Sequence, residues 1–124
     1  MKDNPVVHFE IYADDPDKLR QFYTDMFDWT IEPVPDMDYA YIKTIDVDEQ
    51  GMPMQAGGIN GGLLKRPAEY TGRGWMNYVS VDSIDSAIER AQKLGAKVMK
   101  GKMPVPGMGW FAMLTDPQGN MFAL

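Results

Sequence analysis

Residues 6–27 read VVHFEIYADDPDKLRQFYTDMF and place one strand directly before one helix. Apolar side chains alternate with other types over residues 6–12, which is typical of a strand with one buried face. Asp15 is suited to cap the first amides of a helix, and Pro16 is suited to its first turn. The apolar side chains that follow at helical spacing are Leu19, Phe22, Tyr23, Met26 and Phe27. The stretch therefore predicts a strand and then a helix over residues 15–27.

A second strand and helix follow the same plan later in the chain. Residues 78–81 read YVSV and predict a strand, and residues 83–94 predict a helix with Ser83 as its N-cap. Gly95 suits the position just after a helix, where the backbone often turns left-handed. The apolar residues at helical spacing are Ile84, Ala87, Ile88, Ala91 and Leu94.

A constant offset of 68 residues relates the two copies. Asp82 follows Asp14 by 68 positions, and the segment DPQG at residues 116–119 follows DEQG at residues 48–51 by the same distance. Both four-residue segments predict turns between strands. The recurring offset indicates an internal duplication of a unit made of a strand, a helix and three strands.

The duplication predicts one α+β domain over residues 1–124, with two βαβββ modules at residues 5–64 and 74–124 and a linker at residues 65–73. The later strands of the first module are expected near residues 30–32, 39–46 and 58–64. Those of the second module are expected near residues 97–100, 109–115 and 120–124. Because each helix covers one face of its sheet, we expect a curved mixed sheet around a cleft that binds a ligand.

The composition argues against several functions. The chain has 18 acidic and 12 basic residues and a net charge of -6, which disfavours binding to nucleic acid or to anionic membranes. The absence of cysteine excludes thiolate catalysis, zinc–thiolate sites and disulfides. No apolar run reaches the roughly 18–20 residues of a membrane-spanning helix, and no signal-peptide pattern opens the chain, so we expect a cytoplasmic protein.

Four segments carry a resemblance that covers essentially the whole chain: HFEIYADDPDKLRQFYTDMFDW, GGINGGLLKR, VDSIDSAIERAQKLGAKV and PVPGMGWFAMLTDPQGNMFAL. In this order and spacing, the sequence resembles the vicinal oxygen chelate (VOC) superfamily of glyoxalase I, bleomycin-resistance proteins and extradiol dioxygenases. The resemblance implies the glyoxalase/bleomycin resistance/dioxygenase fold. For the metalloenzymes among these proteins, it also implies one divalent cation held by His or Glu side chains from the first and last strands of each module.

The resemblance assigns the metal-ligand positions to His8, Asn60, Met76 and Ala123. Only His8 is a good ligand for a divalent cation, whereas a catalytic metal normally needs three protein ligands. We therefore expect no cofactor, assign no catalytic residue, and interpret His8 as a hydrogen-bonded residue that lines the pocket. A divalent metal is the alternative, since Glu10 and Tyr12 share the face of His8 and Tyr78 is expected across the cleft.

Aromatic side chains are expected to form part of the cleft. Strand alternation directs one of the adjacent rings Trp110 and Phe111 into the cleft and the other toward the helix, and core packing is the alternative for both. The predicted ligand-binding residues are His8, Glu10, Tyr12, Asn60, Met76, Tyr78, Trp110 and Ala123.

Glycines and cations complete the candidate features. The run AGGINGG at residues 56–62 is not a phosphate loop, because it lacks the lysine and the strand–loop–helix context of that motif. Its glycines are expected to permit a bulge or a close approach of strands. Lys65, Arg66 and Arg73 lie in the linker, where we expect solvated side chains, with an anionic ligand at the rim as the alternative.

Three functions are consistent with these features. The missing metal ligands, together with the aromatic and methionine content, favour metal-free binding of a small hydrophobic or aromatic molecule. The alternative is a metal-dependent enzyme (a glyoxalase-type lyase, an isomerase or an extradiol-type dioxygenase) that acts on a small oxygenated substrate. A partner-binding module is the third, and the general tendency of such folds to dimerise makes a homodimer an expectation.

Overall fold

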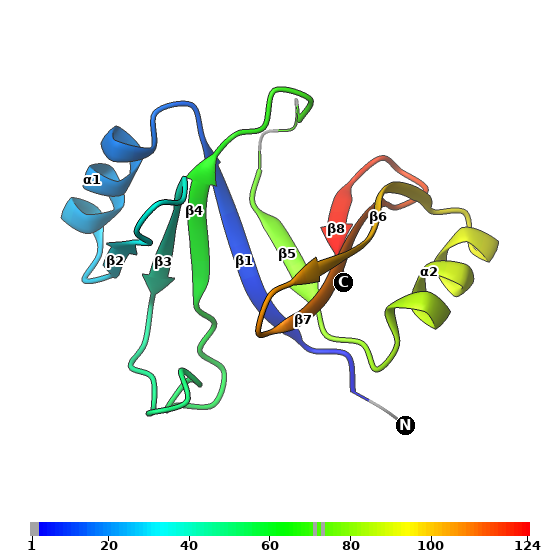
Figure 1. Cartoon of the computed structure of the whole chain (residues 1–124), viewed down its shortest axis with the longest axis horizontal. Coiled ribbons are helices and arrows are strands. Elements are labelled where there is room, and N and C mark those ends of the chain that lie inside the picture. The colour runs from blue at the N-terminus through cyan, green and yellow to red at the C-terminus, as the bar shows by residue number, and fades with distance from the viewer. Residues whose placement is uncertain (1–2, 71, 73) are drawn as a thin grey trace. The chain divides into compact units, whose positions relative to one another are not determined.

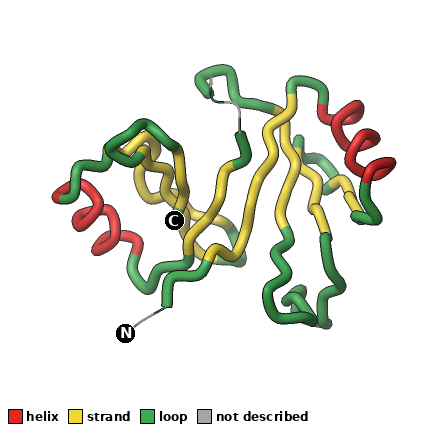
Figure 2. The backbone as a smooth tube through the Cα atoms, turned by 180° about the vertical axis from the view of Figure 1, so that it is seen from behind, coloured by secondary structure: helices red, strands yellow, loops and turns green. Residues whose placement is uncertain are grey.

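A computed structural model describes residues 3–70, 72 and 74–124 (Figure 1). Arg73, one of the predicted linker cations, lies outside the described residues. Each half of the chain has the order strand, helix and three strands, which can be followed along the tube in Figure 2. The predicted α+β class and the two βαβββ modules are confirmed.

Contacts within the chain define two compact units. The N-terminal unit comprises residues 8–75. The C-terminal unit comprises residues 76–124 together with residues 1–7.

The elements of the N-terminal half are β1 (Val6–Ala13), α1 (Pro16–Met26), β2 (Thr30–Pro33), β3 (Tyr39–Lys43) and β4 (Gly61–Lys65). Their strands have the order β2-β3-β4-β1. β1 and β4 run parallel, whereas β3 pairs antiparallel with both β2 and β4. β4 therefore separates β1 from β3, a fact on which the geometry of the site depends.

The face of this sheet that meets α1 forms the hydrophobic core of the N-terminal unit. The buried residues of this core are Phe9, Ile11, Ala13, Ile42 and Leu63. Leu19 and Tyr23 of α1 pack against them. Successive side chains of a strand point to opposite faces, so His8, Glu10 and Tyr12 of β1 lie on the face away from α1.

The C-terminal half repeats this arrangement with β5 (Met76–Val79), α2 (Ile84–Lys93), β6 (Lys97–Val105), β7 (Gly109–Thr115) and β8 (Met121–Ala123). The strand order is β5-β8-β7-β6, in which β5 and β8 are parallel and the other pairs are antiparallel. α2 packs against β6 and β7. Met76 and Leu114 are the largest fully buried side chains of this half.

Both helices begin at the predicted caps. Asp15 Oδ1 accepts a hydrogen bond from the Lys18 amide at 3.2 Å, and Ser83 Oγ accepts one from the Ser86 amide at 3.2 Å. Each cap satisfies an amide that has no acceptor inside its own helix. Gly95 follows α2 with a φ of 102°, a left-handed conformation that glycine adopts readily.

The strands differ from the predicted ranges at β3, β4, β5 and β6. β5 begins at Met76, two residues before the strand predicted at residues 78–81. β3 and β4 are shorter than predicted, and residues 44–60 connect them. β6 is longer than predicted and continues to Val105. Its pairing with β7 is irregular between Val98 and Met103, and Pro104 is tolerated because β6 is an edge strand.

Neither helix approaches the length of a membrane span. α1 has 11 residues and α2 has 10, whereas crossing a bilayer takes about 20. Among the described residues, no helix is long and apolar enough to cross a membrane.

Candidate functional site

The face of the N-terminal sheet away from α1, which we call the distal face, carries the polar side chains of β1 and β3. Strand pairing aligns Glu10 of β1 with Gly62 of β4, and Gly62 with Tyr41 of β3. One pleat further along, the pairing aligns Tyr12, Leu64 and Tyr39 in the same way. Because side chains alternate along each strand, these six residues and His8 share one face.

Three side chains of the distal face form a hydrogen-bonded group, which we call the distal network. The Tyr39 hydroxyl donates to Glu10 Oε2 at 2.8 Å. His8 Nε2 lies 3.1 Å from the same hydroxyl and 3.4 Å from Glu10 Oε2. An imidazole, a phenol and a carboxylate are thus within hydrogen-bonding distance of one another.

Burial keeps the phenol of the distal network protonated. Glu10 is only 8% exposed, whereas the His8 side chain is 32% exposed. Burial raises the pKa of the Tyr39 phenol, and the charge of Glu10 raises this pKa further. Tyr39 therefore stays protonated and donates to Glu10, while His8 is the more accessible partner.

Two adjacent glycines of β4 allow neighbouring atoms to approach closely. A Cβ at Gly62 would lie 1.9 Å from the Tyr39 hydroxyl, and a Cβ at Gly61 would lie 2.2 Å from the Phe9 carbonyl oxygen. The close approach predicted for this glycine run is confirmed, and the pairing of β4 with both neighbours is continuous rather than bulged.

The side chain of Asn60 forms hydrogen bonds with the segment that follows β3. Its Oδ1 accepts hydrogen bonds from the Thr44 amide at 2.7 Å, the Ile45 amide at 3.2 Å and the Thr44 hydroxyl at 3.2 Å. Its Nδ2 is buried without a partner among the described residues. The side-chain Oδ1 of Asn60 thus stabilises the segment that follows β3, and its lone pairs already accept hydrogen bonds from the protein.

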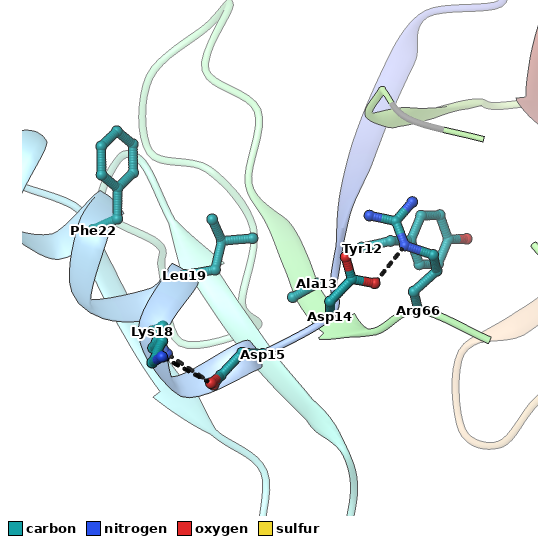
Figure 3. Close-up of a pocket in the computed structure, with 8 residues that line it drawn as sticks. All are labelled: Tyr12, Ala13, Asp14, Asp15, Lys18, Leu19, Phe22 and Arg66. Atoms are coloured by element: carbon teal, nitrogen blue, oxygen red, sulfur yellow. Dashed lines mark hydrogen bonds and ion pairs between the residues drawn. The ribbon is translucent and has the colours of Figure 1, made fainter. Parts of the chain in front are cut away.

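Tyr12 lies at the edge of a pocket of about 420 Å³ (Figure 3). Its ring is 4.6 Å from the Tyr70 ring, and Tyr12 is 6% exposed. Arg66 Nε lies 3.0 Å from Asp14 Oδ1, and Arg66 Nη1 donates to the Gly72 carbonyl. The expectation of a solvated side chain is wrong for Arg66, because its guanidinium is paired and its side chain is 16% exposed.

The predicted ligand-binding residues of the C-terminal unit are Met76, Tyr78, Trp110 and Ala123. Met76 and Ala123 are fully buried, and Tyr78 pairs with Ala123 across β5 and β8. Met76 occupies the position of His8 in the second copy, so a buried thioether replaces the imidazole there. Their roles in ligand binding are still predictions.

Trp110 lies beside the start of α2. It is 56% exposed, and Lys102 Nζ lies 4.6 Å from its ring centroid and 3.0 Å from Asp85 Oδ2. A pocket of about 460 Å³ at this point is lined by residues 81–85, Lys102 and residues 108–110. Since alternation places adjacent residues on opposite faces, Phe111 is the ring on the face of β7 away from Trp110.

The predicted metal-ligand positions do not form a donor set for a divalent cation. His8 Nε2 and Asn60 Oδ1 are engaged by protein groups, and neither Met76 nor Ala123 offers a side-chain nitrogen or oxygen. Within residues 3–70, 72 and 74–124, no group of three His, Cys, Asp or Glu side chains is placed to hold a metal ion. These residues therefore do not fit the divalent cation that the resemblance implies.

The predicted ligand-binding residues did not include Tyr39 or Gly62. The segment DYAYIK at residues 38–43 carries a usable signal, because Tyr39 and Tyr41 alternate with the apolar residues Ala40 and Ile42. That pattern places the tyrosines opposite the core. It does not identify their partners on β1, which depend on strand register.

Comparisons with known proteins agree with this architecture. The sequence profile of the glyoxalase-like domain family matches residues 7–124. CFP32 of Mycobacterium bovis, whose name describes a candidate glyoxylase, is 27% identical over 118 residues, which cover 93% of this chain and 41% of CFP32. The chain therefore spans less than half the length of this relative.

Solved structures share the fold at low sequence identity. A glyoxalase/bleomycin resistance protein/dioxygenase superfamily member from Vibrio splendidus 12B01 has a TM-score of 0.60 at 16% identity, over 98% of this chain and 97% of that one. A variant of methylmalonyl-CoA epimerase from Streptomyces coelicolor has a TM-score of 0.62 at 19% identity, over 96% and 94%. Since the profile spans nearly the whole sequence, the chain belongs to the glyoxalase-like domain family, with the fold of the glyoxalase/bleomycin resistance/dioxygenase (VOC) superfamily that its sequence resembles.

Proposed function

We propose that this chain binds a small, neutral aromatic molecule on the distal face of the N-terminal unit, without a resident metal. The distal network is the observation that carries the proposal, because it presents polar groups in a fixed arrangement. Beside it, Tyr41 is 48% exposed, and its ring lies 5.7 Å from the Tyr39 ring. Fixed polar groups next to an accessible aromatic surface are typical of small-molecule sites.

The charges of the distal face favour a neutral ligand over an anion. Glu10 is an acceptor in a mostly buried position, where like charges repel more strongly than in water. Lys43, a cation on this face of β3, lies 3.5 Å from Glu32 and is therefore already paired. A ligand hydroxyl can exchange hydrogen bonds with the distal network, whereas a ligand carboxylate would meet the charge of Glu10.

The aromatic part of the ligand supplies the affinity. Each Å² of apolar surface removed from water stabilises a complex by about 25 cal/mol. Burial of about 200 Å² against Tyr41 and its neighbours would contribute about 5 kcal/mol, which corresponds to a dissociation constant in the sub-millimolar range. A molecule of one or two aromatic rings has enough apolar surface to provide this burial.

The occupied donor atoms support the metal-free part of the proposal. An imidazole already bonded to a phenol and an amide oxygen already bonded to three donors would each have to be released before they could bind a cation. The proposal predicts that chelator treatment leaves ligand binding unchanged. A full equivalent of a transition metal that is lost in His8→Ala would contradict it and favour the metalloenzyme alternative.

Calorimetric titration with a matched pair of probes tests the proposal. We expect 2-naphthol to bind and 2-naphthoate to bind at least about tenfold more weakly. Tyr41→Ala should weaken 2-naphthol binding, while Phe22→Ala, which removes a similarly exposed ring from α1, should not. Equal effects of the two substitutions, or tighter binding of the carboxylate, would show that the distal face is not the site. No turnover of the methylglyoxal–glutathione adduct is expected.

A further inference from the structure

We propose that Gly62 is the positioning residue of the distal network, because a bare backbone at this point of β4 allows Tyr39 to reach Glu10 and His8. The inference deepens the proposed function and rests on that function only for its ligand-binding readout. Its structural part concerns the contact of Tyr39 with β4 and stands independently.

The reach of Tyr39 requires it to cross a whole strand. Tyr39 is on β3 and Glu10 is on β1, and β4 lies between them. Two inter-strand spacings amount to about 9–10 Å, yet the Tyr39 hydroxyl ends 2.8 Å from Glu10 Oε2. The phenol must therefore extend across the backbone of β4 at the row that contains Glu10, and that row is occupied by Gly62.

The space over Gly62 is filled by the phenol itself. A Cβ at this position would lie 1.9 Å from the Tyr39 hydroxyl and 2.1 Å from its Cζ. Real Cβ atoms do not approach other heavy atoms so closely, so the phenol would have to move by more than 1 Å, roughly the difference from van der Waals contact. A hydrogen bond stretched by that amount falls outside the normal range, and Glu10 would lose its hydrogen bond from Tyr39.

The neighbouring glycine does not share this role. Gly61 faces the opposite side of the sheet, where its hypothetical Cβ meets the Phe9 carbonyl oxygen and ring. A substitution at Gly61 would disturb backbone and core, whereas a substitution at Gly62 would disturb one side chain of the distal network. Gly101 in β6 provides a matched control, because no other atom of the described residues lies within 4 Å of the place that a Cβ would take there.

A double-mutant comparison of Gly62→Ala with Tyr39→Ala tests the inference. We expect Gly62→Ala to lower the urea midpoint of unfolding clearly in the parent and much less in the Tyr39→Ala background. Gly101→Ala should have the same small effect in both backgrounds. If Gly62→Ala alone fails to fold, recovery of a folded protein in the double variant supports the inference. The same loss in both backgrounds, or failure of both variants to fold, overturns it.

Two further readouts separate positioning from general destabilisation. The Tyr39 phenol has a raised pKa in the parent. Alkaline titration of phenolate absorbance should show that this phenol ionises at lower pH in Gly62→Ala than in the parent. Gly101→Ala should titrate as the parent does. In parallel, 2-naphthol affinity should fall at least about tenfold in Gly62→Ala. An unchanged phenol titration overturns the inference. A shifted titration in a protein whose parent form does not bind 2-naphthol keeps the inference and rejects the proposed function.

Discussion

The two copies of the βαβββ module match at one turn and differ in their first strands. In each turn the opening aspartate, Asp48 or Asp116, accepts from the amides two and four residues later. The distances are 2.9 and 3.0 Å in the first copy and 2.8 and 3.0 Å in the second. The glycine that follows has a positive φ in both copies, 79° at Gly51 and 87° at Gly119. The turn is therefore conserved between the copies at the level of individual atoms.

The first strands show the opposite behaviour. His8 belongs to a hydrogen-bonded network and its side chain is 32% exposed, whereas Met76, at the equivalent position, is fully buried. Each copy therefore preserves the interactions that form the module, while only the N-terminal copy carries an imidazole at this position. The internal repeat therefore predicts the scaffold and does not predict the site.

Truncation of the two equivalent side chains should give the largest difference between the copies. Met76→Ala is expected to lower the free energy of unfolding by about 2–5 kcal/mol, since it leaves a cavity in a packed core. His8→Ala is expected to cost about 1 kcal/mol, because it removes a partly exposed hydrogen-bonding group. Urea unfolding followed by circular dichroism measures both. Equal losses would mean that the two positions have the same structural role.

Removal of the Tyr39 hydroxyl tests the network that only the first copy has. Tyr39→Phe should cost about 1–3 kcal/mol, because the buried Glu10 carboxylate loses the hydrogen bond from Tyr39. The raised pKa of Tyr39 stabilises the fold below the ordinary tyrosine pKa of about 10, and this contribution is lost as the pH rises further. Stability should therefore fall above about pH 10 in the parent, and less steeply in Tyr39→Phe.

If Tyr39→Phe and the parent lose stability in parallel above about pH 10, Tyr39 is not the group responsible.

The helix caps should behave alike in the two copies. Asp15→Ala and Ser83→Ala are each expected to cost about 1 kcal/mol, because each leaves one helix amide without its acceptor. Ser86→Ala, in the first turn of α2 but not its cap, should have a smaller effect. Thermal unfolding of the three variants measures these losses of stability. A large difference between the two cap variants would show that the two helix starts are not equivalent.

The smallest expected effect concerns the one difference between the matched turns. Asn120 Nδ2 donates to Asp116 Oδ2 at 3.0 Å, while the equivalent residue of the first copy, Met52, has no side-chain donor. This side-chain hydrogen bond, with those from neighbouring amides, lowers the pKa of Asp116. Stability from Asp116 is therefore present above the ordinary aspartate pKa and is lost as the pH falls through the lowered value.

Asn120→Met should raise the pKa of Asp116 toward that of an ordinary aspartate, which carboxyl NMR titration would detect. Gln118→Ala leaves that side-chain bond in place and serves as the control. An unchanged titration of Asp116 in Asn120→Met would show that the backbone amides alone lower its pKa.

Local chemistry in the sequence was sufficient to predict the helices, the turns and the order of helices and strands along the chain. The cap at Asp15 joins residues three apart, and the turn at Asp116 joins residues at most four apart. Interactions of that range are set by residue type and spacing alone. The close approach at Gly61 and Gly62 was also predictable, because glycines inside a strand often mark a point where other atoms come close to the backbone.

The distal network could only be found in the folded chain. Tyr39 lies 29 residues from Glu10 along the sequence. In the sheet, β4 separates the strand of Tyr39 from the strand of Glu10, and Gly62 belongs to β4. A shift of one residue in the pairing of β4 would move Gly62 to the core face and separate the two side chains. Strand register depends on the packing of the whole unit, so tertiary structure decides which polar residues of the repeat meet, whereas the sequence alone determines that the repeat exists.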